Sequence, residues 1–223
     1  MKRPILRTAV VGFATGSLYW ASWRLIRISK RWGATDSETV RDVPGDELLP
    51  QGRSTTYAIS IAAPPEEVWP WLVQLGHGRG GFYTYTAIER LLGADIDNLD
   101  WIDPSLQTLK PGERIWMTPE RYLGHLPGQF WRVRQVQPER ALVLERKPPE
   151  SPQRAIWSLV LQPAAGGSTR LLDRHRSEPR PGAGGSLSDA FWLVGTFLME
   201  RGMLRGIKAR AEQSHRNGRL APH

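Results

Sequence analysis

The sequence predicts one α+β domain in which an antiparallel sheet packs against a long C-terminal helix. Five segments between residues 113 and 178 are rich in strand-forming residues and are separated by short turns, which is typical of an antiparallel meander. A break rich in proline and glycine then leads into residues 187–214, which are predicted to form one long helix. The chain has 223 residues, 40% of them hydrophobic, enough for one sizeable core.

The predicted elements follow one another along the chain. Residues 55–62 alternate in side-chain size and are predicted to form the first strand, which ends at Pro64. Apolar residues then recur at helical spacing over residues 66–75, and a second short helix is expected over residues 85–92. The later strands are expected at residues 113–118, 129–136, 141–147, 155–163 and 168–178.

Between the two short helices, Gly76 to Gly81 fit the pattern G-x-G-x-x-G of a dinucleotide-binding turn. That turn needs a strand before the glycines and a helix after them, so that the pyrophosphate meets free N–H groups at the helix N-terminus. Here the glycines join one predicted helix to another. This helix-to-helix setting argues against NAD binding, and no cofactor is expected.

Residues 1–31 form a separate apolar segment flanked by basic residues. The sixteen uncharged residues between Arg7 and Arg24 would span roughly 24 Å as a helix, and snorkelling arginines would lengthen the apolar run. Aromatic residues at positions 19, 20 and 23 cluster at one end, as interfacial anchors do. We therefore expect residues 5–26 to associate with a membrane as a single N-terminal anchor. A helix lying on the membrane surface, or a cytoplasmic protein, is the alternative.

The charge distribution argues against a nucleic-acid partner. The net charge is +8, but seven of the 30 basic residues lie in residues 1–32, where there is no acidic residue. This leaves 23 basic against 22 acidic side chains, whereas a nucleic-acid-binding domain carries its basic patch on the fold itself. The absence of cysteine excludes disulfides, thiolate catalysis and cysteine-bound metal. Nothing in the sequence indicates the oligomeric state.

Three segments resemble the signature segments of a bacterial SRPBCC family, in the superfamily of START domains and polyketide cyclases. They are WGATDSETVRDVPGDELLP (32–50), WPWLVQLGHGRGGFYTYTAIERLLG (69–93) and MERGMLRGIKARAE (199–212). The resemblance covers about residues 32–214 and implies the helix-grip fold, in which a curved sheet wraps the last helix around a cavity. Related branches carry lipids or hydrophobic ligands, and others catalyse cyclisation or dehydration.

The domain organisation follows from these patterns. Residues 32–54 are polar and punctuated by proline and glycine, and are expected to be an extended lead-in. Residues 55–214 are expected to form the helix-grip domain, and residues 215–223 a disordered tail.

Alternation along the strands sorts side chains to the two faces of the sheet. On the last strand, Arg170, Arg174 and Arg176 would be costly to bury, so the opposite face, with Asp173 and His175, is expected to point inward. The residues expected to line the cavity are Trp131, Val133, Leu142, Leu144, Trp157, Leu159 and Leu171 from the strands, and Phe191 and Leu198 from the helix.

Asp173 and His175 are the candidate catalytic pair, because a carboxylate beside an imidazole in an apolar cavity can act as general acid or base. The alternative is that they anchor the C-terminal helix or lie at a solvated strand end. No metal site is expected, since no histidine has zinc-like spacing to a second ligand.

The glycine corner is a candidate gate for the cavity. His77, Arg79, Tyr83 and Tyr85 would lie at the mouth, where Arg79 would meet an anionic headgroup or carboxylate. A fixed structural turn is the alternative.

The leading functional hypothesis is binding of a hydrophobic small molecule or lipid between the sheet and the C-terminal helix. The alternative is an enzyme of the polyketide cyclase or dehydratase kind that uses Asp173 and His175 as acid and base. A structural or partner-binding module with a filled core is a third possibility.

Overall fold

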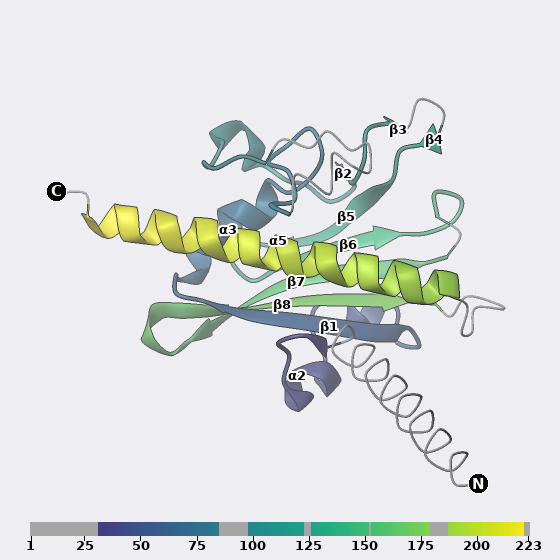
Figure 1. Ribbon diagram of the computed structural model, residues 1–223, viewed down its shortest axis with the longest axis horizontal. Helices are drawn as coiled ribbons and strands as arrows, with labels where there is room; N and C mark the ends of the chain where they lie inside the picture. The colour runs from purple at the N-terminus through teal and green to yellow at the C-terminus, as the bar shows by residue number, and fades with distance from the viewer. Residues whose placement is uncertain (1–30, 85–97, 123–125, 152, 179–186, 221–223) are drawn as a thin grey trace, which may run out of the picture.

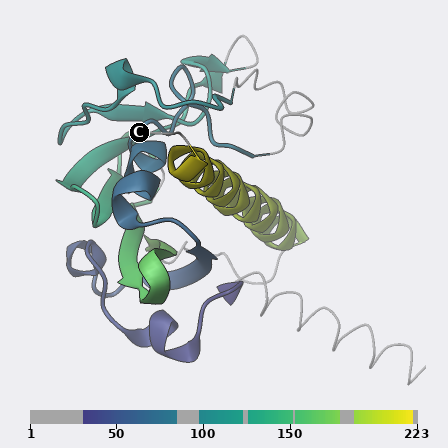
Figure 2. The same ribbon diagram turned by 90° about the vertical axis from the view of Figure 1, so that its left-hand side faces the viewer.

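A six-stranded antiparallel sheet curves around one long helix, α5 (Leu187–Leu220), in the computed structural model (Figure 1). The structure describes residues 31–84, 98–122, 126–151, 153–178 and 187–220. Within them the strands run in the order β1-β8-β7-β6-β5-β2. The predicted α+β helix-grip fold is therefore confirmed, and Figure 2 shows the sheet curving along one side of α5.

The strands agree with the predicted meander. The six strands of the sheet are β1 (Arg53–Ile61), β2 (Arg114–Trp116), β5 (Phe130–Gln137), β6 (Ala141–Arg146), β7 (Ala155–Ala164) and β8 (Ser168–Ser177). Two further short strands, β3 (Arg121–Tyr122) and β4 (Leu126–Pro127), pair with each other. The register between β5 and β6 shifts between Val133 and Gln135, and such a bulge bends the strand that carries it.

The first predicted short helix is α3 (Pro65–Val73). Proline at its first position costs little, because the N–H that proline lacks would have no partner there. Its buried face, which includes Val68, Trp71 and Leu72, packs into the core. The second short helix, expected at residues 85–92, lies outside the described residues.

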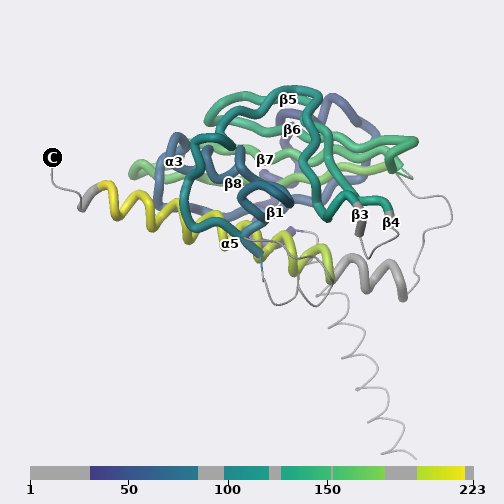
Figure 3. The backbone as a smooth tube through the Cα atoms, turned by 90° about the horizontal axis from the view of Figure 1, so that it is seen from above, coloured from purple at the N-terminus to yellow at the C-terminus, as the bar shows by residue number. Residues whose placement is uncertain are grey.

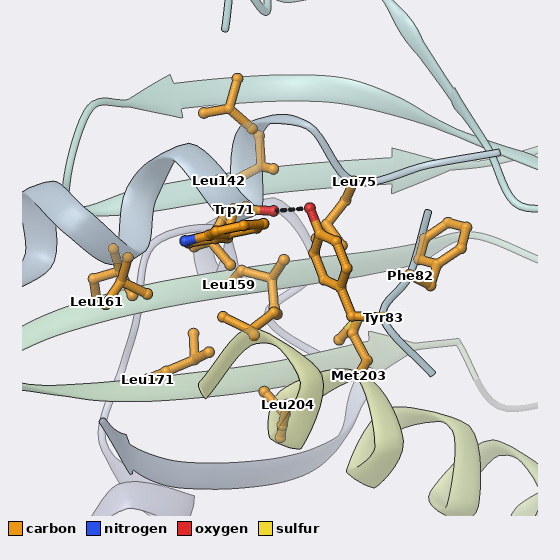
Figure 4. Close-up of a cluster of buried hydrophobic side chains, with 14 of the residues drawn as sticks. Trp71, Leu75, Phe82, Tyr83, Leu142, Leu159, Leu161, Leu171, Met203 and Leu204 are labelled. Atoms are coloured by element: carbon orange, nitrogen blue, oxygen red, sulfur yellow. Dashed lines mark hydrogen bonds between the residues drawn. The ribbon is translucent and has the colours of Figure 1, made fainter. Parts of the chain in front are cut away.

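The main hydrophobic core lies between the inner face of the sheet and α5. Figure 4 shows Trp71 and Tyr83 in this cluster, and the Tyr83 hydroxyl donates a hydrogen bond of 3.2 Å to the Trp71 carbonyl. Side chains from the strands and from α5 close around them. The labelled strand and helix residues are Leu142, Leu159, Leu161, Leu171, Met203 and Leu204.

The segment before β1 differs from the expected extended lead-in. It contains α2 (Asp36–Val40), which begins with a capping box between Thr35 and Glu38, and a 3-10 turn, η1 (Asp46–Leu48). Gly45 enters that turn with φ of 99°. The proline and glycine residues therefore mark turns between short folded elements.

This lead-in covers the outer face of the sheet, on the side away from α5 (Figure 3). Val43 packs against Ala58, Val160 and Leu172. The outer face was expected to be the more exposed one, with its arginines in solvent. Instead Arg174 is only 3% exposed, because the lead-in supplies polar partners for its guanidinium.

One residue of α5 that was predicted to line the cavity is instead exposed. Leu198, expected in the cavity, is 40% exposed, while Phe197 packs against the core. Leu198 lies five residues before the buried Met203, and this interval does not keep two residues on one face of a helix. Phe191 lies outside the part of α5 whose side chains are described.

Two further expectations concern the C-terminal tail and the N-terminal anchor. Helix α5 continues to Leu220, so the tail predicted to be disordered from residue 215 is helical up to that point. His215 Nδ1 lies 2.7 Å from Glu67 Oε1, which ties this last part to α3. No helix within the described residues has the length and apolar character needed to cross a membrane. The anchor predicted at residues 5–26 lies outside the described residues.

Candidate functional site: a buried polar cluster between the sheet and helix α5

Three titratable side chains meet between the sheet and α5: Asp173 and His175 from β8, and Glu200 from α5. We call them the Asp173–His175–Glu200 cluster. His175 Nε2 lies 3.2 Å from Asp173 Oδ1 and 3.3 Å from Glu200 Oε1. The strand alternation placed Asp173 and His175 on the same side of β8, and both do turn toward α5.

Aromatic side chains from the neighbouring strands enclose the cluster. In the strand register Trp157 of β7 lies opposite His175, and Tyr57 of β1 lies opposite Asp173. The Trp157 ring stacks on the His175 ring, with centroids 5.3 Å apart and planes 15° apart. The Trp131 ring and the same imidazole form an edge-to-face pair, with ring centroids 6.2 Å apart. The cluster is therefore a polar site with an indole wall.

The cluster is buried and incompletely hydrogen-bonded. Asp173 is 0% exposed, and its Oδ1 accepts a hydrogen bond of 2.7 Å from Trp157 Nε1. The other oxygen, Oδ2, has no hydrogen-bond partner within the described part of the chain, and neither has Glu200 Oε2. His175 Nε2 is close to both carboxylates but makes a hydrogen bond of good geometry with neither. Burial of such groups is costly unless another partner satisfies them.

Burial and the neighbouring charges shift the pKa values of the cluster. Burial alone would lower the pKa of His175, but the carboxylates of Asp173 and Glu200 outweigh it and raise that pKa to about 10. Burial, together with the Asp173 carboxylate, raises the pKa of Glu200 to about 7. Burial also raises the pKa of Tyr57, followed by the negative charges of Asp173 and Glu200, so its hydroxyl keeps its proton at neutral pH.

Each member of the cluster also offers one atom that can bind a metal ion, and these atoms lie within 4.8 Å of one another. The spacing of histidines in the sequence does not reveal this arrangement, because Glu200 lies on another element, far along the chain. The position of Glu200 could have been predicted from helical spacing, since it lies three, four and seven residues before Met203, Leu204 and Ile207 on the buried side of α5. An acidic residue on that apolar side points into the interior.

The strand residues expected to line the cavity all lie on the inner face and belong to the buried core. The buried ones are Trp131, Val133, Leu142, Leu144, Trp157, Leu159 and Leu171. Of these, Trp131 and Trp157 contact the imidazole of His175. The part of the inner face beside the cluster is thus the aromatic part, and the rest of it is aliphatic.

The glycine corner has the geometry of a fixed turn. Gly76 and Gly81 exchange two backbone hydrogen bonds of 3.0 Å, and the Gly80 N–H donates to the Gln74 carbonyl at 2.7 Å. Both glycines of the exchanging pair have positive φ, 129° and 81°, which glycine adopts without strain. These contacts favour a structural turn over a loose hinge.

The described gate residues divide between a surface pocket and the core. The Arg79 guanidinium donates to two backbone carbonyls, of Val73 and Leu106, so it is held by the protein itself. Tyr83, expected at the cavity mouth, is 3% exposed and belongs to the core. His77 is partly exposed and, together with Arg79, lines an open surface pocket of about 440 Å³. Tyr85 lies outside the described residues.

No family model matches this chain, and no curated protein matches it. Several solved structures are similar to it. Protein MLL2253 from Mesorhizobium loti is 17% identical, with a TM-score of 0.43 over 72% of this chain and 98% of that one. Ara h 8.0201 is 11% identical, with a TM-score of 0.42 over 71% and 97% of the two chains. The Aha1 dimer from Colwellia psychrerythraea is 13% identical, with a TM-score of 0.40 over 70% and 96%.

Proposed function

We propose that this protein binds a hydrophobic small molecule or lipid between the inner face of its sheet and α5. In this proposal the polar group of the ligand meets the Asp173–His175–Glu200 cluster. One observation carries the proposal: a buried polar cluster with an indole wall lies in an otherwise apolar interior. Binding sites for small molecules combine a largely apolar lining with a few convergent polar groups. Membership in the SRPBCC superfamily, which the three motif segments suggest, is part of the proposal.

The unsatisfied carboxylate oxygens indicate what the ligand would supply. Leaving a buried acceptor without a partner costs about 1–3 kcal/mol. Asp173 Oδ2 and Glu200 Oε2 are two such acceptors within the described residues. A ligand hydroxyl or ammonium group can donate to them. The His175 side chain is 23% exposed, which puts this end of the site within reach of solvent.

Native mass spectrometry of the full chain tests the proposal. The protein is purified in mild detergent with a chelator present, then incubated with a mixture of fatty acids, sterols and polycyclic aromatic alcohols. We expect one apolar molecule per chain. Glu200→Gln keeps the side-chain shape but weakens a charged hydrogen bond, so it should reduce affinity about tenfold or more. The control is Gln213→Ala, at an exposed position of the same helix. Folded protein that retains no molecule from the mixture would overturn the proposal.

A second candidate is a cyclase or dehydratase that uses Asp173 and His175. The hydrogen bond from Trp157 Nε1 favours it, because it fixes the Asp173 carboxylate 3.2 Å from the imidazole. A carboxylate held in this way can orient a histidine for acid-base catalysis. Incubation with a poly-β-keto thioester should then give a ring product lighter by one water, detected by mass spectrometry. The candidate fails if His175→Ala forms the same product at the wild-type rate.

A further inference from the structure

The atoms of the Asp173–His175–Glu200 cluster are arranged differently from an ordinary ion pair. A protonated imidazole between two carboxylates would aim its N–H at one of them. Here His175 Nε2 lies within 3.3 Å of both Asp173 Oδ1 and Glu200 Oε1, yet its hydrogen-bond geometry is satisfied with neither. The three ligand atoms instead lie within 4.8 Å of one another, between the strand and the helix.

The separations of these atoms match those of ligands around a transition metal. Ligand atoms about 2.0–2.2 Å from an ion lie about 3.0–3.5 Å apart when they subtend an angle of about 90–110° at the ion. The two separations from His175 Nε2, 3.2 and 3.3 Å, fall in this range. These two separations therefore allow the imidazole to share an ion with either carboxylate, and the two carboxylates lie within 4.8 Å of each other.

The unsatisfied oxygens are an independent second observation. Asp173 is completely buried, yet its Oδ2 has no hydrogen-bond partner within the described residues. Glu200 Oε2 is in the same condition and is also buried. Two buried carboxylates with spare lone pairs are costly in an apolar interior, and a doubly charged cation would offset both the charge and the missing contacts.

We propose that Asp173, His175 and Glu200 together bind one divalent transition-metal ion. The surroundings support a rigid site. Trp157 holds Asp173 through its indole N–H and stacks on His175, as the residues around metal ligands commonly do. The ligands come from the middle of a strand and from a long helix, so their spacing is set by the packing of β8 against α5. The metal site uses the same cluster as the proposed function but requires no apolar ligand.

The ligand set indicates which ion is bound. Calcium and magnesium prefer oxygen atoms alone, whereas one imidazole with two carboxylates suits Mn²⁺, Fe²⁺ or Zn²⁺. Three protein ligands leave at least one coordination position open. Because the His175 side chain is the partly exposed member of the cluster, that position can take a water molecule or an oxygen of a bound small molecule.

Metal titration of the chelator-treated full chain tests this inference without any added apolar ligand. Isothermal calorimetry with Mn²⁺ and Zn²⁺ should give one ion per chain. Co²⁺ as a spectroscopic probe should give the visible absorption of a site with nitrogen and oxygen ligands. Glu200→Gln and Asp173→Asn should each weaken binding at least about tenfold. Circular dichroism checks that both variants remain folded.

The matched control is Glu67→Gln. Glu67 lies 2.7 Å from His215 and is a second carboxylate–imidazole pair, outside the cluster. This variant should bind the metal as the wild type does. The inference is overturned if the wild type binds no ion at a ratio of one, or if Glu200→Gln binds as tightly as the wild type. Ligand binding measured in chelator is a separate readout, so failure of the metal site leaves the proposed function standing.

Discussion

The buried ion pair between Asp46 and Arg174 should hold the lead-in to the outer face of the sheet. Arg174 Nη1 lies 2.6 Å from Asp46 Oδ2, and the two side chains are only 3% and 5% exposed. The same carboxylate accepts a hydrogen bond of 3.1 Å from the Val43 N–H. Asp46→Ala therefore removes one partner of a buried ion pair and also leaves a backbone donor without its acceptor.

The expected loss follows from the burial of both partners. Removing one member of a buried ion pair typically costs about 3–5 kcal/mol, because the remaining charge stays in a low-dielectric environment. Arg174 keeps its hydrogen bonds to Thr56 Oγ1 and to the Arg41 carbonyl, so the lower half of that range is expected. A loss of about 3 kcal/mol corresponds to a fall of roughly 6–12 °C in Tm for a domain of this size.

Urea unfolding followed by tryptophan fluorescence measures the loss, since the chain contains ten tryptophans. The control is Asp100→Ala. Asp100 also pairs with an arginine, Arg210 at 2.7 Å, but its side chain is 81% exposed, so its loss should be below about 1 kcal/mol. In a double-mutant cycle with Arg174→Met, the Asp46–Arg174 coupling should reach about 2 kcal/mol. The reasoning is refuted if Asp46→Ala costs no more than the control.

Two further predictions concern acid stability and the glycine corner. The hydrogen bond and ion pair with Arg170, 2.8 Å away, lower the pKa of Glu38 to about 2, so Glu38 stabilises the fold above its unfolded pKa, near 4.5. The free energy of unfolding should therefore fall by up to about 3 kcal/mol as the pH drops from about 5 toward 2. Urea unfolding at several pH values measures this fall, and Glu38→Gln should flatten it. Gly80→Ala places a Cβ 2.8 Å from the Gln74 carbonyl oxygen and should cost about 2 kcal/mol or more. In Gly78→Ala the new Cβ has no neighbour within 4 Å, so the only cost is the roughly 1–2 kcal/mol of placing alanine at positive φ. Thermal unfolding measures both variants, and an equal fall in Tm for Gly80→Ala and Gly78→Ala would contradict this account.

The strands and their two faces could be predicted because each depends on local alternation. Trp157, Leu159 and Leu161 recur on every second residue of β7, and all three lie in the inner core. The same alternation put Asp173 and His175 together on β8. The fold order then followed from counting strands and turns before a long helix.

The rest depended on partners that are distant in the chain. Arg174 was expected in solvent because three arginines on one face are costly to bury, while its actual partner, Asp46, belongs to the lead-in. Glu200 was missed for the same reason, since its role appears only when α5 lies against β8. The prediction that Leu198 of α5 faces the core was wrong. The apolar pattern breaks at this residue, so tertiary packing decides which side of the helix is buried.

The position of β1 has a consequence for how the chain folds during synthesis. Its hydrogen-bonded neighbour is β8, the last strand to be made, with Arg53 opposite Ser177. Strands β5 to β8 can pair with their neighbours as they emerge, but β1 must wait while most of the chain is translated. Pairing between such distant segments is slow, and an open strand edge can meanwhile join other chains. Ribosome-bound chains that end before residue 168 should therefore remain open to protease at β1; protection there would contradict this order of folding.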